Sequence, residues 1–303
     1  MIKKTFRLFS FFFLTILLLF FGLFIFVSCK STKFYNTQTY RTNQKIYFKP
    51  DTVEVFLLGT VHKPTKQFNI DTLYNTLELI KPDIILYEYD STGFDKQMNL
   101  KKYFAYILPI FLSKYQTNEG AAAKKYITLN EKVIIRPYEW SLRNKWNKEK
   151  GILKTPDKIL NLLDELYKQR KLTNEQTNIL TTFYDLSKQL NSYADSTIYE
   201  INSKMQDSIC ELRQNYQYHK IKEIIDKNDN LKDYRDFYVI YEQYWDLRNK
   251  AMAENIFNYV KQNPKKRIVV LNGYFHRYYL RKELLQKQRR GLTFKLVDIH
   301  DLK

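Results

Sequence analysis

Two short motifs share one pattern, in which a glycine at the end of an apolar run is followed three residues later by a histidine. Gly59 and His62 follow "VFLL", and Gly273 and His276 follow "VVLN". The chain has only 7 glycines and 4 histidines, so the repeated spacing stands out from its background. Each glycine permits a sharp backbone turn, and the histidine comes just after it. The pattern predicts two imidazoles at the ends of two strands.

Two carboxylates occur at comparable positions. Glu88 closes the run "DIILYE", and Glu139 follows "KVIIRPY". Two imidazoles and a carboxylate suit zinc, manganese or cobalt with one position left for water, so we expect His62, His276 and Glu88 to bind a divalent metal. Such a metal lowers the pKa of its water, and Glu139 would take the proton as a general base.

Other interpretations of these residues stay open. A histidine at a strand end can be a hydrogen-bonded structural residue. Asp90 lies on the same face of its strand as Glu88 and could replace it. Glu139 could cap the positive end of the following helix. The remaining histidines, His219 and His300, lack a comparable context and are expected at the surface.

The segment "WDLRNKAMAENIFNYV" (245–260) is typical of a helix. Arg248, Met252 and Asn255 are spaced so that they share one face. Arg248 could bind a substrate carboxylate, or it could hold Glu88 or Glu139 in place; a plain surface arginine is the alternative.

The elements that must position these residues follow from hydrophobic periodicity. A helical pattern over 70–80 joins two β-runs, which is the β-α-β unit of parallel sheets. In such sheets the functional groups gather beyond the carboxyl ends of the strands. We therefore expect an α/β fold over 51–303, with a parallel or mixed central sheet and a large helical insertion at about 140–262. The expected strands lie within 53–59, 83–90, 132–140, 266–273 and 293–300, and a helix kinked at Pro109 is expected over 100–115.

The amino terminus resembles a targeting segment. A basic start is followed by an uncharged, largely apolar stretch over 8–28 and then by Cys29 in "FVSC". This order fits a lipoprotein signal peptide with Cys29 as the lipidated residue, and the length also permits an uncleaved membrane-spanning anchor. Residues 30–50 read as a polar tether. We expect the domain at the cell envelope, anchored by lipid or by an N-terminal helix and facing the periplasm.

Composition narrows the function classes. The formal net charge is +18, but the lysines are spread evenly and no nucleic-acid motif is present, so nucleic acid is not expected as a partner. With Cys29 acylated, Cys210 would be alone, and it is expected to be a small, half-buried helical residue. The signatures GxSxG, HExxH, GxGxxG and the phosphate loop are all absent.

Four segments in order resemble the TraB/Tiki-type family, related to the erythromycin-esterase and ChaN-like superfamily. They are "LLGTVHKP", "DIILYEYD", "RNKAMAENI" with Arg248 and Asn249, and "VVLNGYFHRYYLRKELL". The resemblance implies an α/β core with a helical insertion and site residues at His62, Glu88, Arg248 and His276. It also implies the membrane-tethered, metal-dependent peptidase activity of Tiki members.

Two functions from different classes follow as expectations. The first is a membrane-tethered, metal-dependent hydrolase of the cell envelope, in particular a peptidase. The second is a non-catalytic binding module of the same fold, with histidines that hold haem, a metal or a partner. The pairing of two imidazoles with carboxylates favours the hydrolase, since it exceeds what simple binding needs. The substrate cannot be read from the sequence.

Overall fold

The computed structural model describes residues 50–96, 117–290 and 294–302. The chain divides into two units, Met1–Phe48 and Lys49–Lys303, and the description below concerns the second. The predicted leader with Cys29, the tether as far as residue 49 and the apolar segment 100–115 lie outside the described residues. Within the described ranges, no helix is both long enough and apolar enough to cross a membrane.

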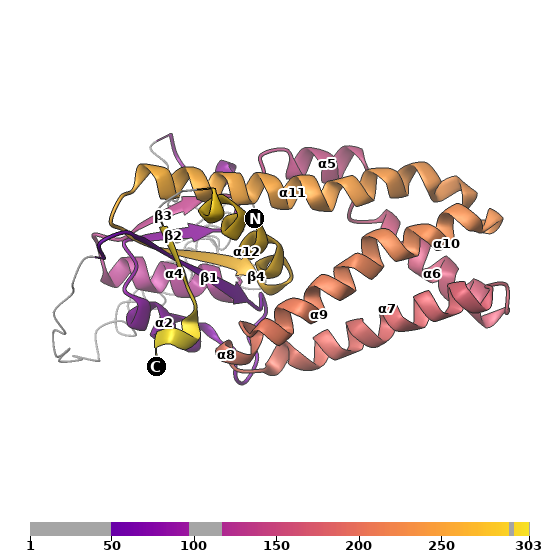
Figure 1. Cartoon of the computed structure of the whole chain (residues 1–303), viewed down its shortest axis with the longest axis horizontal. Helices are drawn as coiled ribbons and strands as arrows, with labels where there is room; N and C mark the ends of the chain where they lie inside the picture. The colour runs from indigo at the N-terminus through magenta and orange to yellow at the C-terminus, as the bar shows by residue number, and fades with distance from the viewer. Residues whose placement is uncertain (1–49, 97–116, 291–293, 303) are drawn as a thin grey trace, which may run out of the picture. The chain divides into compact units, whose positions relative to one another are not determined.

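The core of the second unit is an α/β sheet of five parallel strands in the order β3-β2-β4-β1-β5 (Figure 1). The α/β fold with a helical insertion expected from the sequence is confirmed, and the described sheet is wholly parallel. The strands are β1 (Val53–Thr60), β2 (Ile84–Tyr87), β3 (Ile134–Pro137), β4 (Arg267–Gly273) and β5 (Phe294–Val297).

Helices pack on both faces of the sheet, and β4 shows why. Val269 and Leu271 lie in one hydrophobic cluster with α2 (Ile70–Ile80) and α4 (Asn118–Leu129). The alternate residues of the strand, including Val270, pack instead against α11 (Arg235–Gln262) and α12 (Tyr274–Arg289). A strand buried on both faces reads as a continuous apolar run, as β4 does.

The helices start where the sequence supplies side-chain caps. Asn69 accepts from the backbone of Asp71 and Thr72 at the start of α2, and Thr117 accepts from Gly120 at the start of α4. These side chains satisfy backbone N–H groups that have no partner within the helix. The cap of α4 bears on the site described below, because it fixes the first turn of that helix.

The helical insertion has its own apolar core, built from amphipathic helices and the first half of α11. One boundary differs from the prediction of about 140–262. Met252, Ile256 and Val260, in the second half of α11, pack beneath the sheet, so this long helix belongs to both the insertion and the core. The insertion contains α5 (Arg143–Glu149), α6 (Thr155–Lys168), α7 (Asn174–Ser192), α8 (Ile198–Ile201), α9 (Lys204–Asn215), a π-helical segment (Tyr216–Lys220) and α10 (Ile221–Lys227).

The topology places the two glycine–histidine motifs side by side. β1 and β4 are neighbours, and Thr60 pairs with Gly273 at their carboxyl ends. The chain leaves β1 toward α2 on one face of the sheet and leaves β4 toward α12 on the other. A reversal of this kind is where open α/β sheets bind ligands.

Candidate functional site

Arg248 lies at the centre of a buried polar cluster. Its Nε donates to Glu139 Oε1 at 3.0 Å, and its Nη2 donates to Glu139 Oε2 at 2.6 Å and to Glu88 Oε1 at 2.7 Å. Its Nη1 donates to His276 Nε2 at 3.0 Å. The sequence predicted Glu88 or Glu139 as the partner of Arg248, and the structure shows it paired with both. Burial would lower the pKa of Arg248, but the two carboxylates more than offset it and hold that pKa above its usual value.

His276 lies in the first turn of α12, and both of its ring nitrogens have a hydrogen-bond partner. Its Nδ1 contacts Asn249 Oδ1 at 2.7 Å, while the Asn249 amide nitrogen donates to the carbonyl of Trp245. The amide oxygen must then accept, so Nδ1 carries the hydrogen and Nε2 is the lone pair that faces Arg248. Trp245 stacks on the ring, with centroids 4.6 Å apart. Burial first, and then the Arg248 charge, push the pKa of His276 well below its usual value, so this imidazole is neutral.

The two carboxylates are also tied to backbone. Glu88 Oε2 accepts from the backbone N–H of Gly273 at 2.7 Å. Glu139 Oε1 accepts from the N–H of Trp140 at 2.8 Å, and its Oε2 receives a longer contact of 3.3 Å from Arg143. The interpretation of Glu139 as a cap of the following helix is wrong, because α5 begins at Arg143 without a side-chain cap and Glu139 accepts from the backbone of its neighbour Trp140 instead.

His62 has different surroundings from His276. Its Nδ1 lies 2.5 Å from Glu119 Oε1, and its side chain is 54% exposed while that of Glu119 is 2% exposed. The hydrogen bond to Glu119 is the largest influence on this imidazole and raises the pKa of His62, against a smaller opposite effect of burial. Nδ1 donates to the carboxylate, so Nε2 is left as the basic atom, without a hydrogen-bond partner among the described residues.

The first turn of α4 holds the loop that carries His62. Asn118 N–H donates to the His62 carbonyl at 2.9 Å, and its side chain donates to the carbonyls of Val61 and Phe68. Glu119 is the next residue, so the fixed loop and the fixed helix start bring the carboxylate onto the imidazole. Sequence reasoning missed Glu119, because nothing in the motif signals a partner 57 positions away.

The motif glycines are needed for space, not for a turn as the sequence reasoning had it. Gly273 has a φ of −53°, which any residue adopts. A Cβ on it would lie 3.2 Å from His62 Nε2 and 3.6 Å from Glu88 Oε2. A Cβ on Gly59 would lie 3.2 Å from Arg277 Cδ and from the Tyr274 backbone. The two glycines let the ends of β1 and β4 pack closely.

A second missed residue comes from the insertion. Asn202 is fully buried, and its amide bonds both backbone groups of Gly59, accepting at 2.7 Å and donating at 3.0 Å. A residue of the insertion thereby supplies hydrogen-bond partners for the backbone groups at the end of β1 that have none within the sheet. The pattern offered no signal for this contact.

The remaining candidates lie elsewhere. Asp90 contacts Asn144 and the Thr92 backbone and does not join the cluster. His219 pairs with Glu242, and His300 pairs with Asp298, both with partly exposed side chains as expected. Cys210 corrects the prediction of half burial: it is fully buried, and burial raises the pKa of its thiol to about 12, which leaves it unreactive.

In the arrangement described, Arg248 lies among the three predicted metal ligands. Arg248 donates to Glu88 Oε1 and His276 Nε2, so a guanidinium stands on two of the three groups that the metal would need. Over the described part of the chain, no group of three or more His, Cys, Asp or Glu residues is placed to hold a metal. A cation bound by all three ligands would require Arg248 to withdraw, and no step below is derived through a metal.

The arrangement does support proton transfer. One half-exposed imidazole with a carboxylate behind it lies beside a buried network in which Arg248 pairs with two glutamates. In comparisons with known proteins, no family model, no curated protein and no solved structure matches the chain.

Proposed function

We propose that this chain is a membrane-tethered hydrolase of the cell envelope in which His62 activates the attacking water. The observation that supports this most is the asymmetry of the His62 ring. Nδ1 is held by the buried Glu119 carboxylate, and Nε2 has no partner among the described residues. A base oriented in this way has the correct tautomer before the substrate arrives, and the carboxylate stabilises the imidazolium that forms when it takes a proton.

Glu88 would orient the same water. Its Oε2 and His62 Nε2 lie on the same side of Gly273, at 3.6 and 3.2 Å from where a Cβ would stand. Oε2 already accepts from the Gly273 N–H, and a carboxylate oxygen has a second lone pair to offer. Glu139, Arg248 and His276 then form a rigid support that holds the Glu88 side chain in place.

The peptidase class and the envelope location are proposals that rest on the family resemblance and on the amino-terminal segment. The divalent metal, whether manganese, cobalt or zinc, is also still a prediction. A hydrolase in which His62 acts directly as a base needs no movement of Arg248, and for that reason we place it first. Lewis-acid activation of the water is what a bound metal would supply.

The test is hydrolysis of a peptide and ester panel by the full chain in uncharged detergent. We expect His62→Gln to abolish turnover. The matched control is His219→Gln, since that imidazole is also partly exposed and also bonds a carboxylate, at 2.6 Å. Equal turnover in the wild type and in His62→Gln would refute the proposal.

A second arm separates the metal from the base. Metal content is measured by elemental analysis, and the same reactions are run with a chelator and with added manganese, cobalt or zinc. Turnover that survives chelation supports His62 as a direct base, and turnover that needs metal shows that Arg248 withdraws. Stoichiometric metal or haem binding without turnover of any substrate would favour the non-catalytic binding module.

A further inference from the structure

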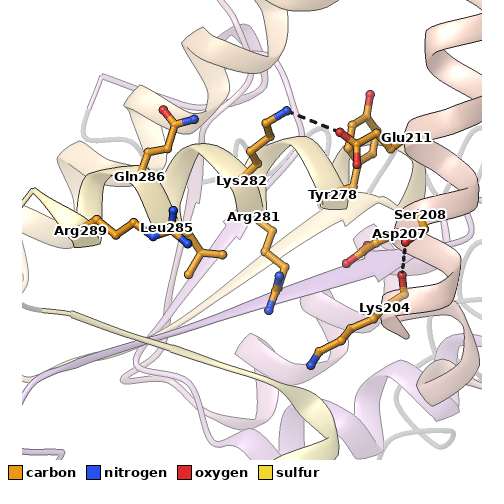
Figure 2. A pocket seen from close by; sticks show the side chains of 10 residues that line it. All are labelled: Lys204, Asp207, Ser208, Glu211, Tyr278, Arg281, Lys282, Leu285, Gln286 and Arg289. Atoms are coloured by element: carbon orange, nitrogen blue, oxygen red, sulfur yellow. Dashed lines mark hydrogen bonds and ion pairs between the residues drawn. The ribbon is translucent and has the colours of Figure 1, made fainter.

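A cavity of about 460 Å³ lies between α9 and α12, at the seam between the insertion and the core. Its two walls are formed by side chains from the facing sides of these two helices. Lys204, Asp207, Ser208 and Glu211 come from α9, and Tyr278, Arg281, Lys282, Leu285, Gln286 and Arg289 come from α12 (Figure 2). The volume suits a small ligand. His276 occupies the first turn of α12, and the cavity uses the later turns.

The charges around this cavity do not balance. Of its two acids, Asp207 is taken by the buried Arg277, whose Nη1 donates to Oδ2 at 2.6 Å. Glu211 is taken by Lys282, at 3.5 Å between Oε1 and Nζ. The other cations, Lys204, Arg281 and Arg289, have no ion pair among the described residues. Two guanidinium groups and an ammonium therefore line one cavity without a direct ion pair, although burial raises the pKa of Asp207 and the Arg281 charge, acting at longer range, partly offsets that rise.

Spacing places two of these cations on the same wall of the cavity. Arg281, Leu285 and Arg289 are four residues apart and lie along one stripe of α12. Lys204 starts α9 on the opposite wall, and Figure 2 shows the Arg281 and Lys204 side chains extending into the space between the two helices. Like charges held together repel each other unless an anion joins them.

We propose that this cavity binds a phosphate-bearing ligand, either a soluble phosphomonoester or the headgroup of an anionic phospholipid. Guanidinium groups match phosphate oxygens with paired hydrogen bonds, and a lysine adds a point charge. Leu285 and the Tyr278 ring supply the apolar wall for the group that carries the phosphate. This site is separate from the proposed hydrolytic site: among the described residues, none of its side chains bonds Glu88, Glu139, Arg248 or His276, and Tyr278 accepts from Trp245, whose ring stacks on His276.

The test uses the full chain in uncharged detergent and isothermal titration. The probes are glycerol 3-phosphate and dihexanoyl phosphatidylglycerol below its micelle concentration, with dihexanoyl phosphatidylcholine as the reference for partition into detergent. We expect saturable binding, and we expect Arg281→Gln with Arg289→Gln to raise the dissociation constant at least tenfold. Lys204→Gln tests the opposite wall, and circular dichroism checks that each variant folds.

The control is Lys188→Gln with Lys232→Gln, which removes the same charge from exposed positions of the insertion outside the cavity. It should leave the dissociation constant within twofold. Binding of glycerol 3-phosphate alone identifies a soluble ligand, and binding of phosphatidylglycerol alone identifies a lipid headgroup. No saturable heat from either probe, or an equal loss in the control, would overturn the proposal, as would equal competition by succinate.

Discussion

His62 and His276 follow glycines at the ends of adjacent parallel strands, and their rings have opposite surroundings. His62 is half-exposed and backed by a carboxylate, so its pKa is raised. His276 is buried beneath Trp245 and faces a guanidinium, so its pKa is lowered. The same motif therefore yields a base that can take a proton and a neutral acceptor that cannot.

The difference teaches that the surroundings of each ring, and not the motif, set its chemistry. Glu119 holds His62 by charge, and Asn249 holds His276 by a neutral amide. A carboxylate behind an imidazole favours the imidazolium, whereas an amide does not. The variants below are designed to break or to sharpen this contrast.

The largest effect is expected from Arg248→Met. The change removes the cation that pairs with both buried carboxylates and leaves Glu139 the longer ion pair with Arg143. Removal of one partner of a buried pair costs about 3–5 kcal/mol. The free energy of unfolding, measured with urea and tryptophan fluorescence, should fall by that amount. The pKa of His276 should also rise, because a positive neighbour has gone.

The control for this prediction is Arg143→Met. Arg143 also contacts Glu139, but at 3.3 Å and with a third of its side chain exposed. A partly exposed pair is worth about 1 kcal/mol or less. Equal losses of stability in the two variants would mean that Arg248 is not the main stabilising cation of the cluster. The stability loss of Arg248→Lys should lie between those of the two variants, because lysine keeps the charge but lacks the paired N–H groups of the guanidinium.

Replacing each of the two histidines with glutamine, in separate variants, tests the contrast directly. His62→Gln should abolish turnover with a stability change of about 1 kcal/mol or less, because the side chain is half-exposed. His276→Gln should cost about 1–3 kcal/mol, since Asn249 and Arg248 then lose a buried partner. Both are measured as unfolding free energies beside turnover. A stability loss at His62 as large as that at His276 would show that the roles are not divided.

Substitutions at the two motif glycines should likewise differ in their effects on stability and on turnover. In Gly59→Ala the new Cβ meets the Tyr274 backbone at 3.2 Å, so overpacking should cost about 1–3 kcal/mol. In Gly273→Ala it meets the half-exposed His62 ring, which can shift, so stability should fall by about 1 kcal/mol or less while turnover drops about tenfold. Thermal unfolding and kcat/KM check the pair, and loss of stability alone in both variants would contradict it.

Much of the fold was predictable from the sequence because the strands are buried on both faces. The runs predicted at 53–59 and 266–273 match β1 and β4 within one residue. The run at 83–90 was predicted too long, since β2 ends at Tyr87 and Glu88 turns to the Gly273 backbone instead. The packing of the insertion helices was not predictable, because periodicity identifies a helix and its buried face but not its neighbour.

The site was predictable where a residue stands at a strand end, and at Arg248 because helical spacing placed it on one face with Met252 and Asn255. His62, Glu88, Glu139 and His276 follow such ends, and parallel topology brings strand ends together. Glu119 and Asn202 act through tertiary contacts from helix termini, and no spacing rule links them to β1. The expected role of Glu88 as a metal ligand is still a prediction, because the structure shows it bound to Arg248.

The smallest and most specific change is Glu119→Gln, which keeps an oxygen for the Nδ1 hydrogen and removes the charge. Nδ1 stays oriented, so turnover should persist. The raised pKa of His62 should fall back toward its ordinary value near 6.5. If His62 must be neutral to act as a base, activity disappears as pH falls through this pKa. The acid limb of kcat/KM should therefore lie above pH 6.5 in the wild type and move to lower pH in the variant.

Linkage gives this variant a second readout with a definite sign. The folded pKa of His62 is raised, so the stability that its protonation contributes is fully present below about pH 6.5 and is lost as pH rises through the folded value. Glu119→Gln should then reduce the unfolding free energy more at pH 5.5 than at pH 8.5. His276 has the opposite sign: its lowered pKa destabilises the fold as pH falls below about 6.5.

The control for Glu119→Gln is Glu242→Gln at the His219 pair, which should leave the acid limb of kcat/KM in place. An acid limb that stays in place in Glu119→Gln would show that the proton lost at that limb does not belong to His62.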